Sequence, residues 1–340
     1  MINLLFTSAG RRVELIQEFI RARKEKSIEG KIVCADMSEL APALYFADQA
    51  YTVPSIFDPN YLEQLLDICK KEQIRVMIPT IDTELDILSN NVSVFQEAGT
   101  EVLISSPETV KISQDKMKTF HFFKSIGLRT PESYIQGMEY RGTFPCFIKP
   151  KHGSSSINAI KINNQTELDF FKSYIGDYII QDFIEGPEYT IDIFCDFEGN
   201  PIYLTPRLRL ATRSGEVMKT RVVYDDNLEN QVLRIVEALK PKGPMTVQAI
   251  QSKVDGEFWF IEINARFGGG CPLSMKAGAD AAGALYDLLS NKKLQFQRRA
   301  ANMEFTFLRF DQSIFIPQKS DGGYERTKSC HIRPGRYTLP

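Results

Sequence analysis

The chain has 340 residues, of which 43% are hydrophobic and 25% are charged, and its formal net charge at pH 7 is −2. This length and composition are typical of a globular protein with two or three well-packed domains. The small net charge gives no electrostatic reason to expect a nucleic acid or an anionic membrane as partner. No apolar run approaches the roughly 18 residues that span a bilayer, so we expect a cytoplasmic protein that binds no membrane.

The first hundred residues alternate between strand and helix patterns. Residues 2–7, 31–35, 75–79 and 101–105 are predicted strands, and residues 12–26, 59–71 and 84–97 are predicted helices. This rhythm indicates a parallel, doubly wound α/β sheet, whose ligands bind beyond the carboxyl ends of its strands. Arg11 and Arg12 stand there at a predicted helix start and are candidates for holding an anionic substrate. Asp82 and Glu84 follow the third strand and are candidates for meeting an amine.

The pattern changes beyond residue 106, where we place a domain boundary. A helix is predicted to begin at residues 113–116 and to end near Gly127. The rest reads as α+β, with strands joined by polar turns. The predicted strands are residues 146–149, 159–162, 178–183, 189–195, 246–253 and 258–264, and the predicted helices are residues 167–174, 228–239 and 279–290.

The most informative stretch is the predicted strand that ends in Glu262, Asn264 and Arg266 and is followed by three glycines. Residues i, i+2 and i+4 of a strand share a face, so these three side chains are expected to project together. A carboxylate beside an amide oxygen suits a hard cation such as Mg²⁺. An arginine one step further can bind a phosphate through two parallel hydrogen bonds. The alternative is a half-exposed strand with an ordinary polar face.

Gln248 joins this group only in certain hairpin registers. A two-residue turn would place Gln248 opposite Ile263, on the wrong face of the sheet. A loop with an odd number of residues would place it opposite Asn264 or Glu262, and we predict such an odd loop.

Three further segments carry weaker signals. Lys149 ends an apolar strand, and the small-residue loop after it offers donors suited to phosphates, although a plain polar loop would look the same. A strand, a linker and a second strand with an acidic start, Glu188, suit adenine and ribose recognition. Arg207 and Arg209 lie on one face of a strand, where they either contact a second anion or form a solvated basic face.

These segments, in this order, resemble the ATP-grasp superfamily, in the branch that contains the carbamoyl-phosphate synthase large subunit, biotin carboxylase and the pyrrolysine-pathway ligase. The resemblance covers essentially the whole chain. It implies a pre-ATP-grasp domain at residues 1–106, an ATP-grasp amino-terminal lid at residues 107–180 and a carboxyl-terminal subdomain with a tail at residues 181–340. The loop after Lys149 has fewer glycines than that of biotin carboxylase. There is one nucleotide clamp, where carbamoyl-phosphate synthase needs two, and no long carboxyl-terminal domain as in biotin carboxylase.

The resemblance also implies roles for individual residues. Gln248, Glu262 and Asn264 match metal ligands, and Arg266 matches a residue at the transferring phosphate. Further residues match an ATP site, with Mg²⁺ as cofactor and Mn²⁺ as an alternative. They are the phosphate-binding lysines Lys116 and Lys149, the loop residues His152, Ser154 and Ser155, the adenine-lining hinge residues Gln181, Asp182, Phe183 and Ile184, and the ribose-binding Glu188.

We therefore expect an ATP-dependent carboxylate–amine ligase that forms an acyl phosphate and releases ADP and phosphate. Such phosphoryl transfer depends on positioning and charge neutralisation, with Arg266, Arg207 and Arg209 as catalytic candidates. The partners are a small-molecule carboxylate and an amine, and a homodimer is expected by base rate. The alternatives are a carbamoyl-phosphate-synthase-like or carboxylate–thiol enzyme, or a nucleotide-binding subunit without turnover.

Overall fold

The computed structural model describes residues 1–152, 158–318 and 324. The chain divides into two compact units. The first consists of Met1–Thr80, Ser93–Glu101 and the described part of Phe310–Pro340, and the second of Ile81–Val92 and Val102–Arg309. No helix among the described residues is long and apolar enough to cross a membrane.

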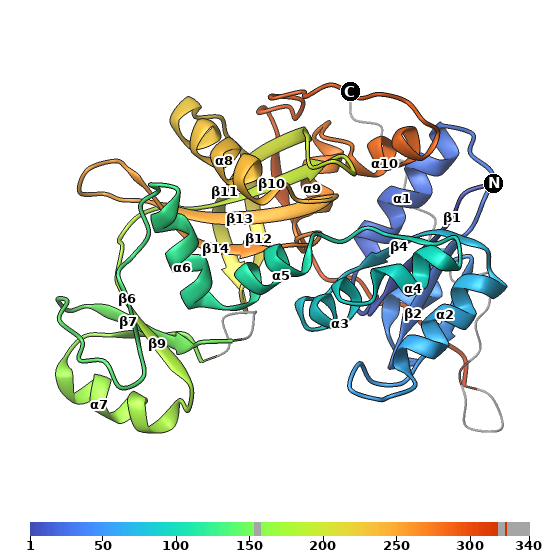
Figure 1. Cartoon of the computed structure of the whole chain (residues 1–340). Coiled ribbons are helices and arrows are strands. Elements are labelled where there is room, and N and C mark those ends of the chain that lie inside the picture. The colour runs from blue at the N-terminus through green and yellow to red at the C-terminus, as the bar shows by residue number, and fades with distance from the viewer. Residues whose placement is uncertain (153–157, 319–323, 325–340) are drawn as a thin grey trace. The chain divides into compact units, whose positions relative to one another are not determined.

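The amino-terminal sheet is parallel, as predicted, and is drawn in blue in Figure 1. Its order is β3-β2-β1-β4-β5, which places β1 at the centre and is a doubly wound order. The strands are β1 (Asn3–Thr7), β2 (Ile32–Asp36), β3 (Gln49–Thr52), β4 (Ile74–Pro79) and β5 (Glu101–Val102), and the helices between them include α1 (Val13–Glu25), η1 (Pro42–Tyr45) and α2 (Tyr61–Lys71). The sequence did not predict β3, a short strand on the edge of the sheet.

The single helix predicted at residues 84–97 is wrong. The structure has a 3-10 turn η2 (Asp82–Glu84), then α3 (Leu85–Ser89) and α4 (Val92–Glu97). Two asparagines interrupt the helix, because the Asn90 amide donates to the Asp86 carbonyl (2.7 Å) and the Asn91 amide to the Ile87 carbonyl (2.8 Å). These side chains compete with backbone donors for the last carbonyls of α3, which favours ending the helix there.

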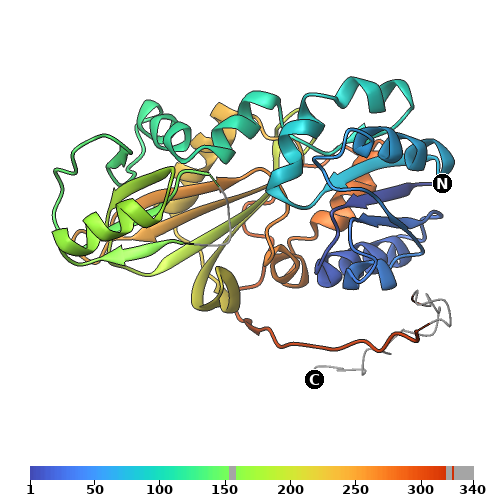
Figure 2. The same ribbon diagram turned by 90° about the horizontal axis from the view of Figure 1, so that it is seen from below.

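The second unit contains two antiparallel sheets. The small one has the order β6-β9-β7-β8, and helix α7 (Gln165–Tyr174) packs on it through Leu168 and Phe171 (Figure 2). Its strands are β6 (Ser133–Ile135), β7 (Cys146–Pro150), β8 (Ile160–Ile162) and β9 (Tyr178–Asp182).

The large sheet has the order β14-β13-β10-β11-β12-β15. Its strands are β10 (Glu188–Cys195), β11 (Pro201–Arg213), β12 (Glu216–Val222), β13 (Pro244–Gln251), β14 (Phe258–Asn264) and β15 (Thr306–Leu308). The remaining helices are α5 (Pro107–Gln114), α6 (Lys116–Ser125), α8 (Asp226–Leu239), α9 (Cys271–Lys276) and α10 (Ala281–Leu289). Asp115 caps α6 by accepting from the N–H groups of Met117 and Lys118, which confirms the predicted helix start.

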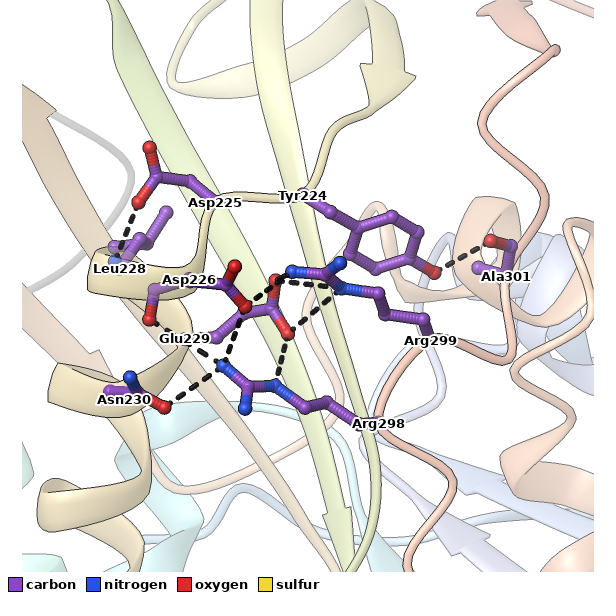
Figure 3. Close-up of polar contacts among 9 residues, drawn as sticks. All are labelled: Tyr224, Asp225, Asp226, Leu228, Glu229, Asn230, Arg298, Arg299 and Ala301. Carbon is purple, nitrogen blue, oxygen red and sulfur yellow. Dashed lines mark hydrogen bonds and ion pairs between the residues drawn. The ribbon is translucent and has the colours of Figure 1, made fainter.

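A buried carboxylate ties α8 to the chain that follows α10 (Figure 3). The Glu229 side chain has no exposed surface, and both of its oxygens accept from arginines. Arg298 Nε donates at 2.6 Å and Arg299 Nη2 at 2.9 Å. Burying a carboxylate is costly unless it is paired in this way, so the two arginines hold residues 298–299 against the helix.

The register of β13 and β14 decides which side chains share a face with Glu262. Ala249 lies opposite Phe260, whereas the next residue, Gln248, lies opposite Glu262. Ile261 is therefore an extra residue in β14, and the pairing shifts there in a β-bulge.

The turn of this hairpin is an even loop, residues 253–256, closed by the Ser252 N–H donating to the Glu257 carbonyl at 2.8 Å. The predicted odd loop is therefore wrong. Gln248 nevertheless lies opposite Glu262, one of the two partners that an odd loop offered, because the bulge adds one residue to β14.

Candidate active site

One face of the large sheet gathers the predicted metal ligands, the predicted ribose carboxylate and two of the catalytic candidates. Residues directly opposite each other in paired strands share a face, and so do residues two apart in one strand. Gln248 lies between Glu262 on one side and Thr190 on the other, and Thr190 lies opposite Arg207. By the same alternation, this face carries the predicted residues Gln248, Glu262, Asn264, Glu188, Arg207 and Arg209.

The proposed metal ligands offer one carboxylate, from Glu262, and two amide oxygens, from Gln248 and Asn264. Such hard oxygen donors suit Mg²⁺, which in nucleotide sites is held through one or two carboxylates together with phosphate oxygens and water. Among the described residues, no group of three or more His, Cys, Asp and Glu side chains is placed to hold a metal. The donor set thus fits a Mg²⁺ ion that is carried on a nucleotide.

Arg266 lies two residues beyond the end of β14, and its guanidinium makes three hydrogen bonds. Nη2 donates to Asp82 Oδ2 (2.5 Å) and to Asn264 Oδ1 (3.3 Å), and Nη1 donates to the Phe267 carbonyl (3.1 Å). The side chain is only 11% exposed. Its Nε is buried and finds no hydrogen-bond partner in the described part of the chain. A buried donor without a partner costs free energy. An anion that accepts a hydrogen bond from Nε would remove this cost.

Two lysines add positive charge close to Glu262. Lys149 ends β7, and Lys116 begins α6, where its Nζ donates to the Lys151 carbonyl (3.4 Å). The pKa of Lys149 is lowered to about 8, chiefly by burial; the Glu262 carboxylate opposes this shift and the Lys116 charge adds to it. Burial also lowers the pKa of Lys116. A polyanion such as a triphosphate would stabilise the charged form of both lysines.

Glu188 starts β10 and is bound to Arg209, whose Nη1 donates to Glu188 Oε1 (2.7 Å). Arg209 Nη2 donates to the Gly215 carbonyl (2.7 Å), so the side chain is fixed by the β11–β12 turn. Burial raises the pKa of Glu188, and the Arg209 charge opposes this. Arg209 therefore acts in this structure by holding the predicted ribose carboxylate.

Arg207 is almost fully buried, at 1% exposure, and its Nη1 finds no hydrogen-bond partner among the described residues. Its Nε donates to Asp192 Oδ2 (2.8 Å) and to Ser274 Oγ (3.0 Å). Its guanidinium also explains a glycine, because a Cβ at Gly270 would lie 2.7 Å from Arg207 Nη2. Packing thus accounts for Gly270, one of the three glycines noted in the sequence.

In the hinge between the two sheets, the side chains of Gln181, Asp182 and Phe183 are engaged in contacts within the protein. Gln181 is buried, and its amide donates to Ser133 Oγ (2.7 Å) inside the small sheet. Asp182 accepts from the Tyr140 hydroxyl (3.2 Å), and burial raises its pKa. Phe183 packs under the Lys161 ammonium, with Nζ 4.3 Å from the ring centroid.

Beyond these contacts, Ile184 lies outside the regular strands. The chain then passes Gly186, where a Cβ would lie 1.8 Å from the Gln251 carbonyl oxygen, so only glycine fits this crossing.

The remaining predicted residues are spread more widely. His152 is exposed and lies 3.8 Å from Asp177, and Ser154 and Ser155 lie outside the described residues. In the first unit, Arg11 is largely exposed, and Arg12 Nη2 donates to the Thr80 carbonyl (3.2 Å). Glu84 is fully buried and accepts from the Ile81 N–H (3.3 Å), so it does not present a free carboxylate to an amine.

Sequence reasoning named Asp82 only as a candidate for meeting an amine and did not predict its bond to Arg266. The two residues are 184 positions apart, and no local pattern links them. Asp192 was also missed, because a lone acid inside an apolar strand gives no signal until its partner, Arg207, is known.

Two family models match consecutive parts of the chain. A model described as a PylC-like N-terminal domain matches residues 4–103, and a model described as an ATP-grasp domain matches residues 113–270.

Individual proteins agree with this. The 3-methyl-D-ornithine–L-lysine ligase of Methanosarcina acetivorans is 26% identical over 74% of this chain and 64% of its own length. The D-alanine–D-alanine ligase of a Marinomonas species is 27% identical over 47% of this chain and 57% of its own length. The chain therefore spans less than two thirds of either relative.

Among solved structures, the biotin carboxylase domain dimer of 2-oxoglutarate carboxylase from Hydrogenobacter thermophilus, in complex with MgADP, ADP and bicarbonate, superposes with a TM-score of 0.68. The identity is 18%, and the match covers 96% of this chain and 83% of that one. This likeness shows the fold. The two domain matches, which together span most of the chain, identify it as a PylC-like N-terminal domain followed by an ATP-grasp domain.

Proposed function

We propose that the protein is a Mg-ATP-dependent ligase that joins a carboxylate to an amine through an acyl phosphate. The observation that carries the proposal is the charge arrangement around Glu262. The Glu262 carboxylate acts on two lysines with lowered pKa values, Lys116 and Lys149, and the Arg266 guanidinium donates to Asn264 on the same sheet face. Such a cluster is unfavourable until a polyanion and a hard cation enter it.

The residues divide the work of phosphoryl transfer. Lys149 and Lys116 bind the phosphates of ATP, and Glu262, Asn264 and Gln248 hold Mg²⁺, which neutralises phosphate charge when bound. Arg266, with its open Nε, stabilises the charge on the group in transfer. The substrate carboxylate attacks the terminal phosphorus, ADP leaves, and the resulting acyl phosphate is an electrophile that an amine can attack.

The relatives supply the class of substrate. Their names describe ligases that join two amino acids, and we propose that this protein joins the carboxylate of one amino acid to the amino group of another. Mn²⁺ as a replacement for Mg²⁺, a homodimer and a cytoplasmic location stay predictions of the sequence. The division into residues 1–106, 107–180 and 181–340 is likewise proposed.

A coupled assay tests the proposal. The protein is incubated with Mg-ATP, hydroxylamine and each of the twenty amino acids in L and D form, and hydroxamate and ADP are measured. Hydroxamate that depends on both the amino acid and ATP supports an acyl phosphate. ADP release that no amino acid stimulates, or the absence of nucleotide binding, contradicts the proposal.

A further inference from the structure

Asp82 is hydrogen-bonded to the guanidinium of Arg266, which we propose stabilises the phosphoryl group in transfer. Its Oδ2 lies 2.5 Å from Arg266 Nη2, and the Asp82 side chain keeps 20% of its surface exposed. The backbone carbonyl of Asp82 accepts from Gln114 Nε2 at 2.5 Å, which fixes η2 at this point. The second carboxylate oxygen, Oδ1, accepts no hydrogen bond from the described residues. A positioned carboxylate thus keeps one oxygen available.

Asp82 lies close to positively charged side chains and is not one of the proposed metal ligands. Its charge acts on Lys116 as well as on Arg266. The metal ligands proposed on the large sheet come from β13 and β14, whereas Asp82 belongs to η2. Asp82 therefore stands beside the phosphate-binding cations with no part in the proposed binding of ATP.

The second half of the reaction requires such a group. In an acyl phosphate, a single oxygen separates the carbonyl carbon from the phosphorus. The amine must come within about 3–3.5 Å of that carbon, and the carbon is close to Arg266 because the phosphoryl group is. The amine must also lose a proton as the new bond forms, and a positioned carboxylate can accept it.

We propose that Asp82 binds the acceptor amine and takes its proton, an inference that rests on the proposed ligase function. The neutral amine uses its lone pair to form the C–N bond. The bond between the carbonyl carbon and the bridging oxygen then breaks, and inorganic phosphate leaves with the electron pair of that bond. The N–H proton passes to Asp82 Oδ1 and then to solvent. Arg266 keeps Asp82 in place through the other oxygen.

Glu84, two residues further along the chain, does not meet the requirements of this role. Its side chain is fully buried, and its Oε1 accepts from a backbone N–H of its own turn. Of the two carboxylates that follow β4, Asp82 is the one with exposed surface and an open oxygen.

The test separates the two half-reactions in Asp82→Asn. With an amino acid that gives hydroxamate in the wild type, one reaction contains hydroxylamine and a second contains ammonium chloride or each of the twenty amino acids as the amine. Hydroxylamine is largely neutral near pH 7.5 and attacks acyl phosphates in solution without an enzymatic base, with its proton passing to water or buffer. We expect hydroxamate formation within about threefold of wild type and amide formation about 100-fold lower, the lower end of the usual effect of general base catalysis.

Asp86→Asn is the matched control, since it removes the same charge from an exposed residue of α3 whose side chain, among the described residues, bonds only to Asn90. It should leave both rates unchanged. If the two rates of Asp82→Asn fall together, Asp82 only orients Arg266, and the inference is wrong. It is also wrong if neither rate falls, or if the wild type forms hydroxamate but no amide with any amine. The absence of hydroxamate with every acid would instead refute the ligase proposal itself.

Discussion

Lys149 gives nucleotide binding a pH dependence whose size follows from its environment. Burial lowers its pKa to about 8, so its protonated fraction falls from about three quarters at pH 7.5 to about one tenth at pH 9. Only the ammonium form attracts phosphate, and bound phosphate raises the pKa of the lysine. The dissociation constant of Mg-ADP should therefore rise about eightfold between these two pH values, with tighter binding at the lower pH.

Calorimetric titration of Mg-ADP at pH 7.5 and pH 9 measures this change. Above pH 7 the terminal phosphate of ADP is already largely deprotonated, because such groups titrate near pH 6. Lys149→Met is the matched variant, since it keeps an unbranched apolar stem and removes the charge. It should bind more weakly at both pH values and change less than about twofold between them. Equal affinities of the wild type at the two pH values, or an eightfold change that survives in Lys149→Met, would refute the reasoning.

Three further outcomes follow from the structure. Glu262→Gln should lower the Mg²⁺-dependent part of ADP affinity at least about tenfold, by analogy with the loss of a metal-orienting group, as measured by titrating Mg²⁺ at fixed ADP. Deleting Ile261, the bulge residue, should preserve Mg²⁺-dependent binding, whereas deleting Ile263 should abolish it, because only the second deletion turns Asn264 to the other face. Replacing Arg298 and Arg299 together by Ala should lower the free energy of unfolding by about 3–5 kcal/mol, since a buried carboxylate loses both partners; urea denaturation measures this, and a loss below about 1 kcal/mol would contradict it.

The parts of the fold that were predicted correctly are those with a strong local period. The alternation of strand and helix was enough to predict a parallel sheet around β1, and Asp115 was enough to place the start of α6. The errors occur where side-chain hydrogen bonds end an element that the hydrophobic periodicity would continue. Asn90 and Asn91 break a segment that reads as one helix, because their amides bond to carbonyls within the preceding turn.

The candidate site shows the same limit. The alternation along β14 correctly puts Glu262 and Asn264 on one face, because that depends on one strand alone. The depth of Arg207 depends on Asp192 and on Ser274, which is 67 residues away from it, and so could not be predicted from its own segment. For the same reason the partner of Arg266 became visible only in three dimensions.

The bulge at Ile261 has a consequence for how such proteins are detected. Because one strand of the hairpin carries a residue that the other does not, the number of residues between Gln248 and Glu262 is free to change by one while the two side chains stay opposite each other. A search that demands a fixed interval between these two predicted ligands would overlook relatives in which the hairpin has lost that residue. Cross-strand pairing, and not distance along the chain, is what homologous sites of this kind have to keep.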